Sequence, residues 1–376
     1  MNDRTAYFDY AATTFMPESV IDSINQYHKD INVAPNRGGS SISIKANKLF
    51  EDSRDHIKNF FTDLDFELIF YPGATYAINA IAYGLEHIIE PMDIILIGPY
   101  EHHSNYLPWR ELALRKKAVL FEMPLLSNGD INFEYLKEIK ERVKIVSYSS
   151  VANTNGYTLS IVRLKEIFGD DVIYISDDSQ KCAHFRFRKN EMADCNIVNS
   201  HKMYGPKSLA GALVNEKFLN HLNPSIFGGG MVERIGFPNI WKSGIQKYEP
   251  GSIDVANCIG WKEACKYINE FGFDNIKSLE KQYSSEILEE LRKKSKVNIV
   301  SVGESTSIVS FWHKDIHAHD IEEIFSNNGI IVRAGHICSQ NSIAKFGMKP
   351  IVRISLGIGI EDYDVEKIVN VIRGYL

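Results

Sequence analysis

The chain has 376 residues, of which 44% are hydrophobic and 24% charged, a balance typical of a globular protein with at least one large core. The formal net charge is -6, and no block of Lys and Arg stands out, which argues against a nucleic-acid partner or a membrane partner. No apolar run is long enough to cross a bilayer, and the first residues lack the apolar core of a signal peptide. We therefore expect a soluble cytoplasmic protein.

Short apolar runs alternate with helical patterns through the first two thirds of the chain. Continuous apolar strands separated by helices indicate a parallel sheet that is covered on both faces. In such sheets, functional residues lie just past the carboxyl ends of the strands. The expected strands are 68–70, 94–97, 118–121, 144–147 and 172–175, and helical patterns fall at 77–85, 133–143 and 161–168.

The pattern changes after about Pro250. A long helical stretch over 259–291 is followed by a compact α+β pattern, which indicates a second unit of domain size. We predict a large α/β domain over residues 16–249 and a smaller α+β domain formed by 1–15 and 250–376, with a cleft between them. The strands expected in the second unit are 308–311, 330–332 and 351–356, with helices near 321–325 and 364–372.

The cysteines are odd in number and scattered, and no CxxC pair occurs. This argues against a disulfide framework and against a zinc site, so no metal is expected. Most cysteines in such a chain are small buried hydrophobic side chains. The five are Cys182, Cys195, Cys258, Cys265 and Cys338.

Two polar residues follow neighbouring strands of the predicted sheet. Asp177 comes directly after a strand that ends at Ser176, and Lys202 follows a short strand at 196–198. Taken alone, an Asp in this position is most often a turn cap, and a lone Lys is a solvated surface charge. Together they supply what pyridoxal 5'-phosphate (PLP) chemistry needs, a lysine amine for a Schiff base and an acid that keeps the pyridine nitrogen protonated.

The segment around these two residues resembles a known family. Asp177-Asp178-Ser179-Gln180, His184 and Ser200-His201-Lys202-Met203-Tyr204-Gly205-Pro206 resemble the cofactor segment of the class V, fold-type I PLP-dependent aminotransferases. Within that class they are most similar to the SufS-like cysteine desulfurases and selenocysteine lyases. The resemblance implies a large domain with a mostly parallel sheet covered by helices, a smaller C-terminal α+β domain, and PLP bound to Lys202.

Further blocks follow the family's order along almost the whole chain. Any one of them would be an ordinary loop, but their order and compatible spacing support the PLP assignment. They are Phe8-Asp9-Tyr10-Ala11-Ala12-Thr13-Thr14, Asn36-Arg37-Gly38 with Arg54, Gly73-Ala74-Thr75-Tyr76-Ala77-Ile78-Asn79, Glu101-His102-His103-Ser104-Asn105, Asn153-Thr154-Asn155-Gly156, Gly228-Gly229-Gly230-Met231 and Glu249-Pro250-Gly251-Ser252.

The resemblance implies a role for individual residues. Ala74 and Thr75 stand in a strand–Gly–helix turn whose N–H groups and helix N-terminus would bind the cofactor phosphate. His102 would stack on the pyridine ring and relay protons, although two neighbouring loop histidines can also be merely solvated. Asn153 and Gln180 would contact the phenolic oxygen. The remaining implied cofactor contacts are Asn199, His201 and Ser252, the last reaching the phosphate of a neighbouring subunit in a homodimer.

One segment distinguishes a desulfurase from an aminotransferase. Arg333-Ala334-Gly335-His336-Ile337-Cys338 resembles the Arg-x-Gly-x-x-Cys motif of the SufS-like group, and Arg353 matches the family's carboxylate-binding arginine. The resemblance implies that Arg333, Arg353 and Asn153 bind the substrate. The Cys338 thiolate would then attack the sulfur of L-cysteine, releasing L-alanine and holding a persulfide for a sulfur-acceptor protein. An isolated cysteine, by contrast, would most often be a buried structural thiol.

Several positions depart from the family's pattern. Gly357-Ile358-Gly359 stands where the family usually has a Tyr-Asn-Thr turn, and Asn199 stands where it has a serine. Ser40 replaces a histidine, and Ser339 follows Cys338 without the usual proline nearby. These changes leave the cofactor residues intact, but they leave open the substrate and the acceptor.

Two other interpretations remain open. The chain could be a class V aminotransferase or C–S lyase that acts on another amino acid, with Cys338 incidental. Formation of a keto acid, as opposed to alanine and sulfide, would distinguish it from a desulfurase. It could also be a non-catalytic PLP-fold scaffold, an interpretation that loss of Lys202 or Arg353 would have supported, whereas both are present.

Overall fold

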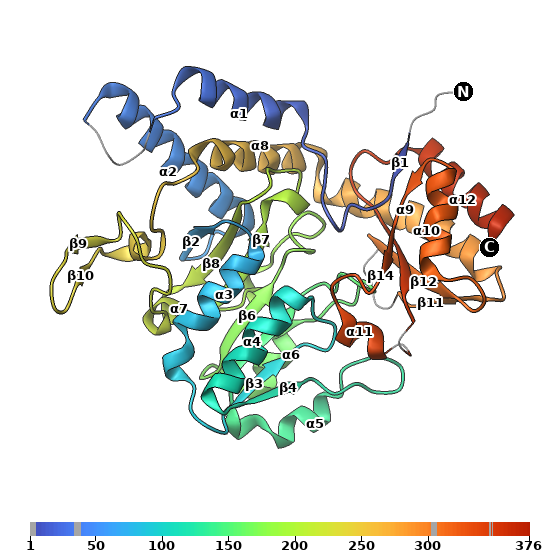
Figure 1. The fold of residues 1–376 in the computed structure, drawn as a ribbon, viewed down its shortest axis with the longest axis horizontal. Helices are drawn as coiled ribbons and strands as arrows, with labels where there is room; N and C mark the ends of the chain where they lie inside the picture. The colour runs from blue at the N-terminus through green and yellow to red at the C-terminus, as the bar shows by residue number, and fades with distance from the viewer. Residues whose placement is uncertain (1–4, 34–38, 302–306, 346, 348) are drawn as a thin grey trace.

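The computed structural model describes residues 5–33, 39–301, 307–345, 347 and 349–376 (Figure 1). Its centre is a seven-stranded sheet with the strand order β2-β8-β7-β6-β5-β3-β4. Strand β8 runs opposite to the other six strands of this sheet, so the prediction of a mostly parallel sheet is confirmed. The strands are β2 (Phe66–Tyr71), β3 (Ile94–Ile97), β4 (Val119–Glu122), β5 (Val143–Ser149), β6 (Ile173–Asp177), β7 (Cys195–Asn199) and β8 (Ala210–Asn215).

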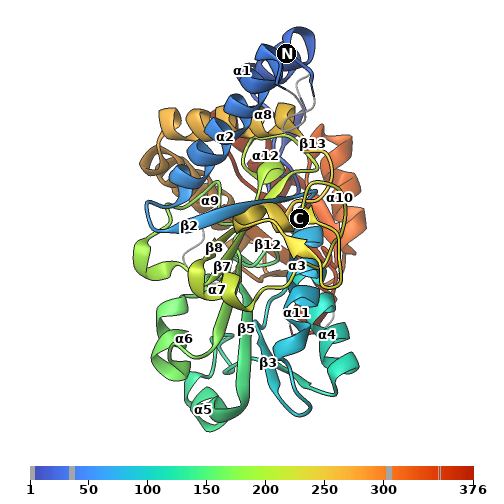
Figure 2. The same ribbon diagram turned by 90° about the vertical axis from the view of Figure 1, so that its left-hand side faces the viewer.

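Helices cover both faces of this sheet, as Figure 2 shows. Successive side chains of a strand point to opposite faces, so the fully apolar β3 contributes to two cores. Ile95 and Ile97 pack under α3 (Ala74–Gly84) and α4 (His103–Lys116). Ile94 and Leu96 pack on the other face, together with residues of α5 (Phe133–Glu138) and α6 (Ile161–Phe168).

The C-terminal unit is built on a four-stranded antiparallel sheet with the order β11-β12-β15-β14. The N-terminal segment joins it, because β1 pairs in parallel with β13 and Asp9 forms a bridge with Ser355. The strands are β1 (Ala6–Tyr7), β11 (Val297–Ile299), β12 (Ile308–His313), β13 (Ile330–Ile331), β14 (Arg333–Gly335) and β15 (Ile351–Ser355), and the helices are α9 (Phe273–Arg292), α10 (Ala318–Asn327), α11 (Gln340–Lys345) and α12 (Asp362–Tyr375).

The helical stretch expected over 259–291 is not one helix. It is divided into α8 (Val255–Phe271) and α9, because Gly272 has a φ of 86°, a value that ends a right-handed helix and that glycine adopts readily. Helix α8 packs against α1 (Glu18–Asp30) and α2 (Ser41–Phe61) beside the large sheet, whereas α9 packs against α12.

The remaining elements are peripheral. A hairpin of β9 (Val232–Arg234) and β10 (Ile240–Trp241) projects from the molecule (Figure 1). Within the described residues, no helix combines the length and the apolar character that crossing a membrane requires. The other short elements are α7 (Glu216–His221), η1 (Glu86–Ile88), η2 (Lys140–Arg142), η3 (Lys189–Glu191), η4 (Ser200–Lys202) and η5 (Gly244–Tyr248).

Candidate active site

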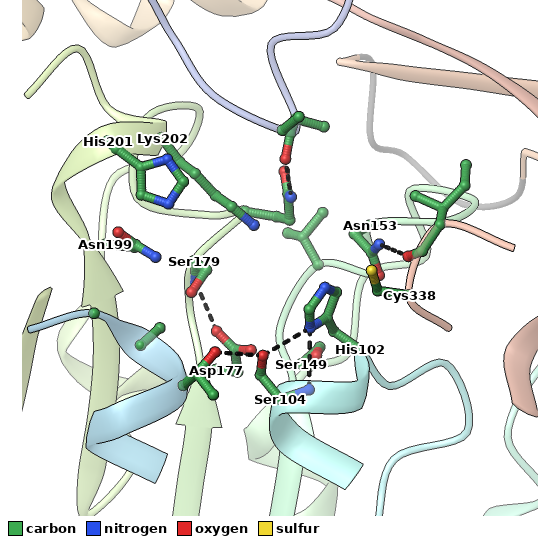
Figure 3. A pocket seen from close by; sticks show the side chains of 18 of the residues that line it. His102, Ser104, Ser149, Asn153, Asp177, Ser179, Asn199, His201, Lys202 and Cys338 are labelled. Carbon is green, nitrogen blue, oxygen red and sulfur yellow. Dashed lines mark hydrogen bonds between the residues drawn. The ribbon is translucent and has the colours of Figure 1, made fainter. Parts of the chain in front are cut away.

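A cavity of about 510 Å³ opens at the carboxyl ends of the parallel strands, beside the C-terminal unit (Figure 3). Side chains from both units line it, so residues that are far apart in the sequence meet there. Twelve of the thirteen site residues predicted from the sequence are among them, namely Ala74, Thr75, His102, Asn153, Asp177, Gln180, Asn199, His201, Lys202, Arg333, Cys338 and Arg353. Their individual roles remain predictions.

Neighbouring strands deliver the two residues on which the cofactor prediction depends. Asp177 is the last residue of β6, and Lys202 ends the 3-10 turn η4 that directly follows β7. Strands β6 and β7 are parallel neighbours, so both side chains emerge at the same edge of the sheet (Figure 3). The carboxylate of Asp177 is oriented by the backbone N–H of Ser179, which donates to its Oδ1 at 3.0 Å.

The amine of Lys202 points into the cavity (Figure 3). Burial lowers the pKa of Lys202, and the nearby carboxylate of Asp177 opposes this effect. A lowered pKa increases the neutral fraction of the amine, which is the form that reacts with an aldehyde. The site therefore combines a reactive lysine with a carboxylate.

His102 caps the N-terminus of α4. Its Nδ1 accepts the backbone N–H of Ser104 at 3.1 Å, so in the neutral ring the proton sits on Nε2. Burial, assisted by the charge of Lys202, lowers the pKa of His102 to about 3. The imidazole is therefore neutral near pH 7, and its flat apolar ring lines the cavity.

The N-termini of α3 and α4 converge on one side of the cavity. The hydroxyl groups of Thr75 and Ser104 are 2.7 Å apart and link the two helices. The first turn of α3 follows Gly73, whose φ is 130°, and no side chain caps it. Its free N–H groups and positive dipole end suit an anion such as a phosphate. His201, which lines the same cavity, has its pKa lowered to about 4 by burial and by Lys202.

The residues present fit PLP. The pyridine nitrogen needs an acid, the aldehyde needs a lysine, and the phosphate needs N–H donors, and the cavity supplies all three. Two polar atoms of its lining, Asn199 Oδ1 and Ser179 Oγ, are buried and have no hydrogen-bond partner among the described residues. Because buried polar atoms normally have a partner, these two atoms are consistent with a polar ligand in the cavity.

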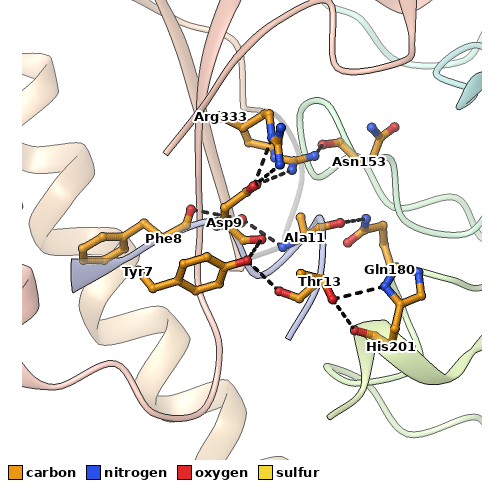
Figure 4. A network of polar contacts seen from close by, with 11 residues as sticks. Tyr7, Phe8, Asp9, Ala11, Thr13, Asn153, Gln180, His201 and Arg333 are labelled. Atoms are coloured by element: carbon orange, nitrogen blue, oxygen red, sulfur yellow. Dashed lines mark hydrogen bonds and ion pairs between the residues drawn. The ribbon is translucent and has the colours of Figure 1, made fainter. Parts of the chain in front are cut away.

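The carboxylate of Asp9 binds both predicted substrate arginines, and Figure 4 shows its contact with Arg333. Asp9 Oδ2 accepts hydrogen bonds from Arg333 Nε and Nη2 at 3.0 and 2.6 Å. Asp9 Oδ1 accepts one from Arg353 Nη2 at 2.8 Å. Arg353 is 2% exposed and also donates from Nη1 to the carbonyl oxygen of Asn153, while its Nε has no partner among the described residues.

Two predicted cofactor contacts have protein partners. The side-chain amide of Asn153 donates to the carbonyl oxygen of Ile337 at 3.0 Å and accepts from the hydroxyl of Ser339 at 3.0 Å, so it holds the residues on either side of Cys338. The amide of Gln180 donates to the carbonyl oxygen of Ala11 at 2.8 Å. Both side chains still line the cavity.

Three other positions that the sequence singled out, namely Ser252, Arg54 and Ser40, do not line the cavity. Ser252 is exposed and does not line it. Glu249, three residues earlier, pairs with the buried Arg54, which thereby ties this segment to α2. Ser40, noted as a departure, caps the N-terminus of α2. The block Asn36-Arg37-Gly38 lies outside the described residues.

Sequence reasoning gave no role to several residues that the structure brings to the site. Asp9 stood in a matched block but carried no local signal of its own. Glu101 is buried and accepts hydrogen bonds from Asn105 and from both the amide and hydroxyl of Ser149. Burial raises the pKa of Glu101 to about 7. The neighbouring His103 is bonded to the Cys338 loop.

Comparison with known proteins defines the class. The profile of the family described as "Aminotransferase class-V" matches residues 6–368. The chain belongs to this family, whose members use PLP.

The relatives within that family agree with one another in name. A "probable cysteine desulfurase" of Halalkalibacterium halodurans is 31% identical over 89% of this chain and 84% of its own length. One of Staphylococcus aureus is 29% identical over 98% of this chain and 92% of its own. Among solved structures, a cysteine desulfurase of Thermococcus onnurineus has a TM-score of 0.92 and 26% identity, covering 98% of this chain and 93% of that one.

Proposed function

We propose that this protein is a PLP-dependent cysteine desulfurase, which converts L-cysteine to L-alanine and forms a persulfide on Cys338. The observation that carries the proposal is the position of Cys338, an exposed thiol on the wall of the cavity that Lys202, Asp177 and Arg353 also line. The names of the relatives, which cover nearly the whole chain, support the same activity.

Different residues would bind the cofactor and the substrate. Lys202 would hold PLP, with Asp177 at the pyridine nitrogen, His102 on the ring, and the N-terminus of α3 with His201 at the phosphate. PLP, when bound, supplies an electron sink for negative charge at the α-carbon of the substrate. The amine of Lys202 would be the base that removes the α-proton of the substrate, because burial lowers its pKa.

Arg353 would bind the carboxylate of the substrate, assisted by Arg333 at the rim. With the amino acid fixed in this way, the Cys338 thiolate attacks the substrate sulfur. The bond between that sulfur and the β-carbon breaks, and a sulfur–sulfur bond forms on Cys338. The β-carbon takes up a proton, and the α-carbon regains the proton that was removed from it, which gives L-alanine. A sulfur-acceptor protein would then collect the persulfide sulfur.

We further propose a homodimer in the cytoplasm. Ser252 lies outside the cavity of its own chain and is exposed, as expected of a residue that reaches the phosphate in a partner subunit. All five cysteines are free thiols, which suits a reducing compartment. For the domains, we propose the division into 16–249 and into 1–15 with 250–376. The pairing of β1 with β13 supports joining the N-terminal segment to the C-terminal unit, whereas α8, within 250–376, packs against α1 and α2.

Product analysis with cysteine, selenocysteine and other amino acids tests the function. Cysteine is expected to give alanine, with the extra sulfur on Cys338 by mass spectrometry, and borohydride reduction is expected to fix PLP on Lys202. Cys338→Ser should retain PLP and lose sulfur transfer from cysteine. Keto-acid formation, or normal turnover of cysteine by Cys338→Ser, would instead favour the aminotransferase or lyase alternative.

A further inference from the structure

The loop that carries Cys338 has a disfavoured backbone conformation. Ile337 and Cys338 have φ values of 50° and 51°, in the left-handed region that only glycine adopts without penalty. A β-branched residue such as Ile337 is a clear outlier there. Such a conformation persists only where the surrounding structure fixes it, and it occurs most often at functional sites.

The contacts that fix this loop come from the large sheet's side of the cavity. The backbone N–H of His103 donates to the carbonyl oxygen of Cys338 at 2.7 Å. The ring Nε2 of His103 accepts the backbone N–H of Gln340 at 3.2 Å. His103 therefore binds the loop at two points, at Cys338 and at Gln340. Asn153 binds the same loop at Ile337.

His103 is the first residue of α4 and directly follows His102. The two rings accept hydrogen bonds from different segments, and they do so through different nitrogen atoms. Nδ1 of His102 accepts an N–H within its own helix, whereas Nε2 of His103 accepts one from the Cys338 loop, which leaves the proton on Nδ1 in the neutral ring. Unlike His102, His103 does not line the cavity, so it is placed to act on the loop and not on the cofactor.

We propose that His103 is a positioning residue for sulfur transfer, which fixes the Cys338 loop against the N-terminus of α4 so that the thiol meets the substrate sulfur. This role rests on the proposed function, since it concerns the attack by Cys338. It couples Cys338, on the loop that follows β14, to the helix α4, whose N-terminus is capped by His102. Of the two hydrogen bonds between His103 and the loop, a side-chain substitution can remove the one between the His103 ring and the backbone N–H of Gln340.

The expected effect is on rate more than on binding. Loss of the ring releases Gln340 and lets the strained loop relax, while the bond between the His103 amide and Cys338 is left in place. A displacement of about 1 Å at a reacting group can cost roughly 100-fold in rate. We expect His103→Ala to slow persulfide formation by about 10- to 100-fold, with KM for cysteine changed by less than about threefold.

The test uses the holoenzyme of wild type, His103→Ala and His103→Gln. The Gln side chain can place its Oε1 near the position of Nε2, so it keeps an acceptor for Gln340 and is expected to recover most of the rate. His28→Ala, which removes an exposed histidine of α1, is the control. Three quantities are measured: the PLP absorbance spectrum, kcat and KM for cysteine, and the single-turnover rate at which Cys338 gains sulfur.

Each result decides one point. A wild-type enzyme that places no sulfur on Cys338 overturns the desulfurase function and this role with it. If the wild type does so and His103→Ala is equally fast, only the role of His103 is wrong. Loss of the PLP spectrum in His103→Ala, or no recovery in His103→Gln, also overturns it, because the residue would then serve the cofactor or the fold in general.

Discussion

Asp9 and Arg353 form a buried ion pair that joins the N-terminal segment to the substrate side of the cavity. Arg353 Nη2 lies 2.8 Å from Asp9 Oδ1, and the two side chains are 2% and 4% exposed. The same carboxylate also binds Arg333, so one acid compensates two cations. Burial lowers the pKa of Arg353, and Asp9 opposes this effect. The arginine expected to bind the substrate therefore depends on an internal carboxylate for its charge and orientation.

Asp9→Asn should destabilise the protein strongly. The variant keeps the shape of the side chain but leaves the buried Arg353 without its counter-charge, and breaking a buried pair in this way costs about 3–5 kcal/mol. Urea denaturation of wild type and variant measures the difference in the free energy of unfolding. Asp63→Asn, which removes an exposed pair with Lys189, is the control and should change stability by less than about 1 kcal/mol. Equal stability of Asp9→Asn and wild type would contradict the argument.

The neutral state of His102 predicts a dependence of apo-protein stability on pH. The pKa of His102 is lowered to about 3, whereas the unfolded chain titrates near 6.5. Between these values the unfolded state binds more protons, so the stability that is present above pH 6.5 is lost as the pH falls towards 3. His102→Asn keeps a capping side chain on α4 but cannot titrate, so its loss of Tm between pH 7.5 and 5 should be smaller. Identical pH dependence in the two proteins would argue against a buried neutral imidazole.

The glycines that replace the family's usual turn after Leu356 are explained by Tyr10. A Cβ at Gly357 would lie 2.3 Å from Cδ1 of the Tyr10 ring, so only glycine fits beside this tyrosine. Gly357→Ala should cost about 1–3 kcal/mol of stability through overpacking. In a double-mutant cycle, its cost should shrink when Tyr10 is replaced by Ser. Gly374→Ala, where a Cβ meets nothing within 4 Å, is the matched control and should be neutral or stabilising. Additive costs at Gly357 and Tyr10 would exclude the steric coupling.

The sequence predicted those parts of the fold that depend on hydrophobic periodicity over neighbouring residues. The helix over 161–168 matches α6 in both bounds, and the strand expected at 196–198 lies within β7, with Lys202 after it. The strand β6 includes Asp177, one residue beyond its expected end. Residues with strong chemistry in matched motifs, such as Lys202 and Cys338, also proved to share one cavity. Periodicity therefore indicated many of the elements, and the family resemblance picked out residues that line one cavity, while their individual roles remain predictions.

What local pattern could not supply were contacts between distant segments. Asp9 and Arg353 are 344 positions apart, and nothing near Asp9 indicates two arginines. The break at Gly272 was missed because helical periodicity continues on both sides of it, and a single glycine decides the outcome through its positive φ. The contacts of His103 with the Cys338 loop bind backbone atoms of that loop, which leave no trace in its side-chain composition.

The difference between Cys338 and the other four cysteines predicts selective chemical modification. Only the thiolate reacts quickly with alkylating reagents, and only where the reagent can reach it. Cys182, Cys195, Cys258 and Cys265 are buried, whereas Cys338 is exposed. Burial raises the pKa of Cys182 to about 12 and raises the pKa values of the other three buried thiols well above their usual range.

Brief treatment of the native protein with iodoacetamide near pH 8 should therefore add one label, at Cys338, as read by peptide mass spectrometry. Cys338→Ser should take up almost none under the same conditions, and unfolding in urea should expose the four buried thiols in both proteins. Rapid native labelling at any of these four would show that the cavity thiol is not uniquely reactive, and it would remove the chemical basis for assigning the persulfide to Cys338.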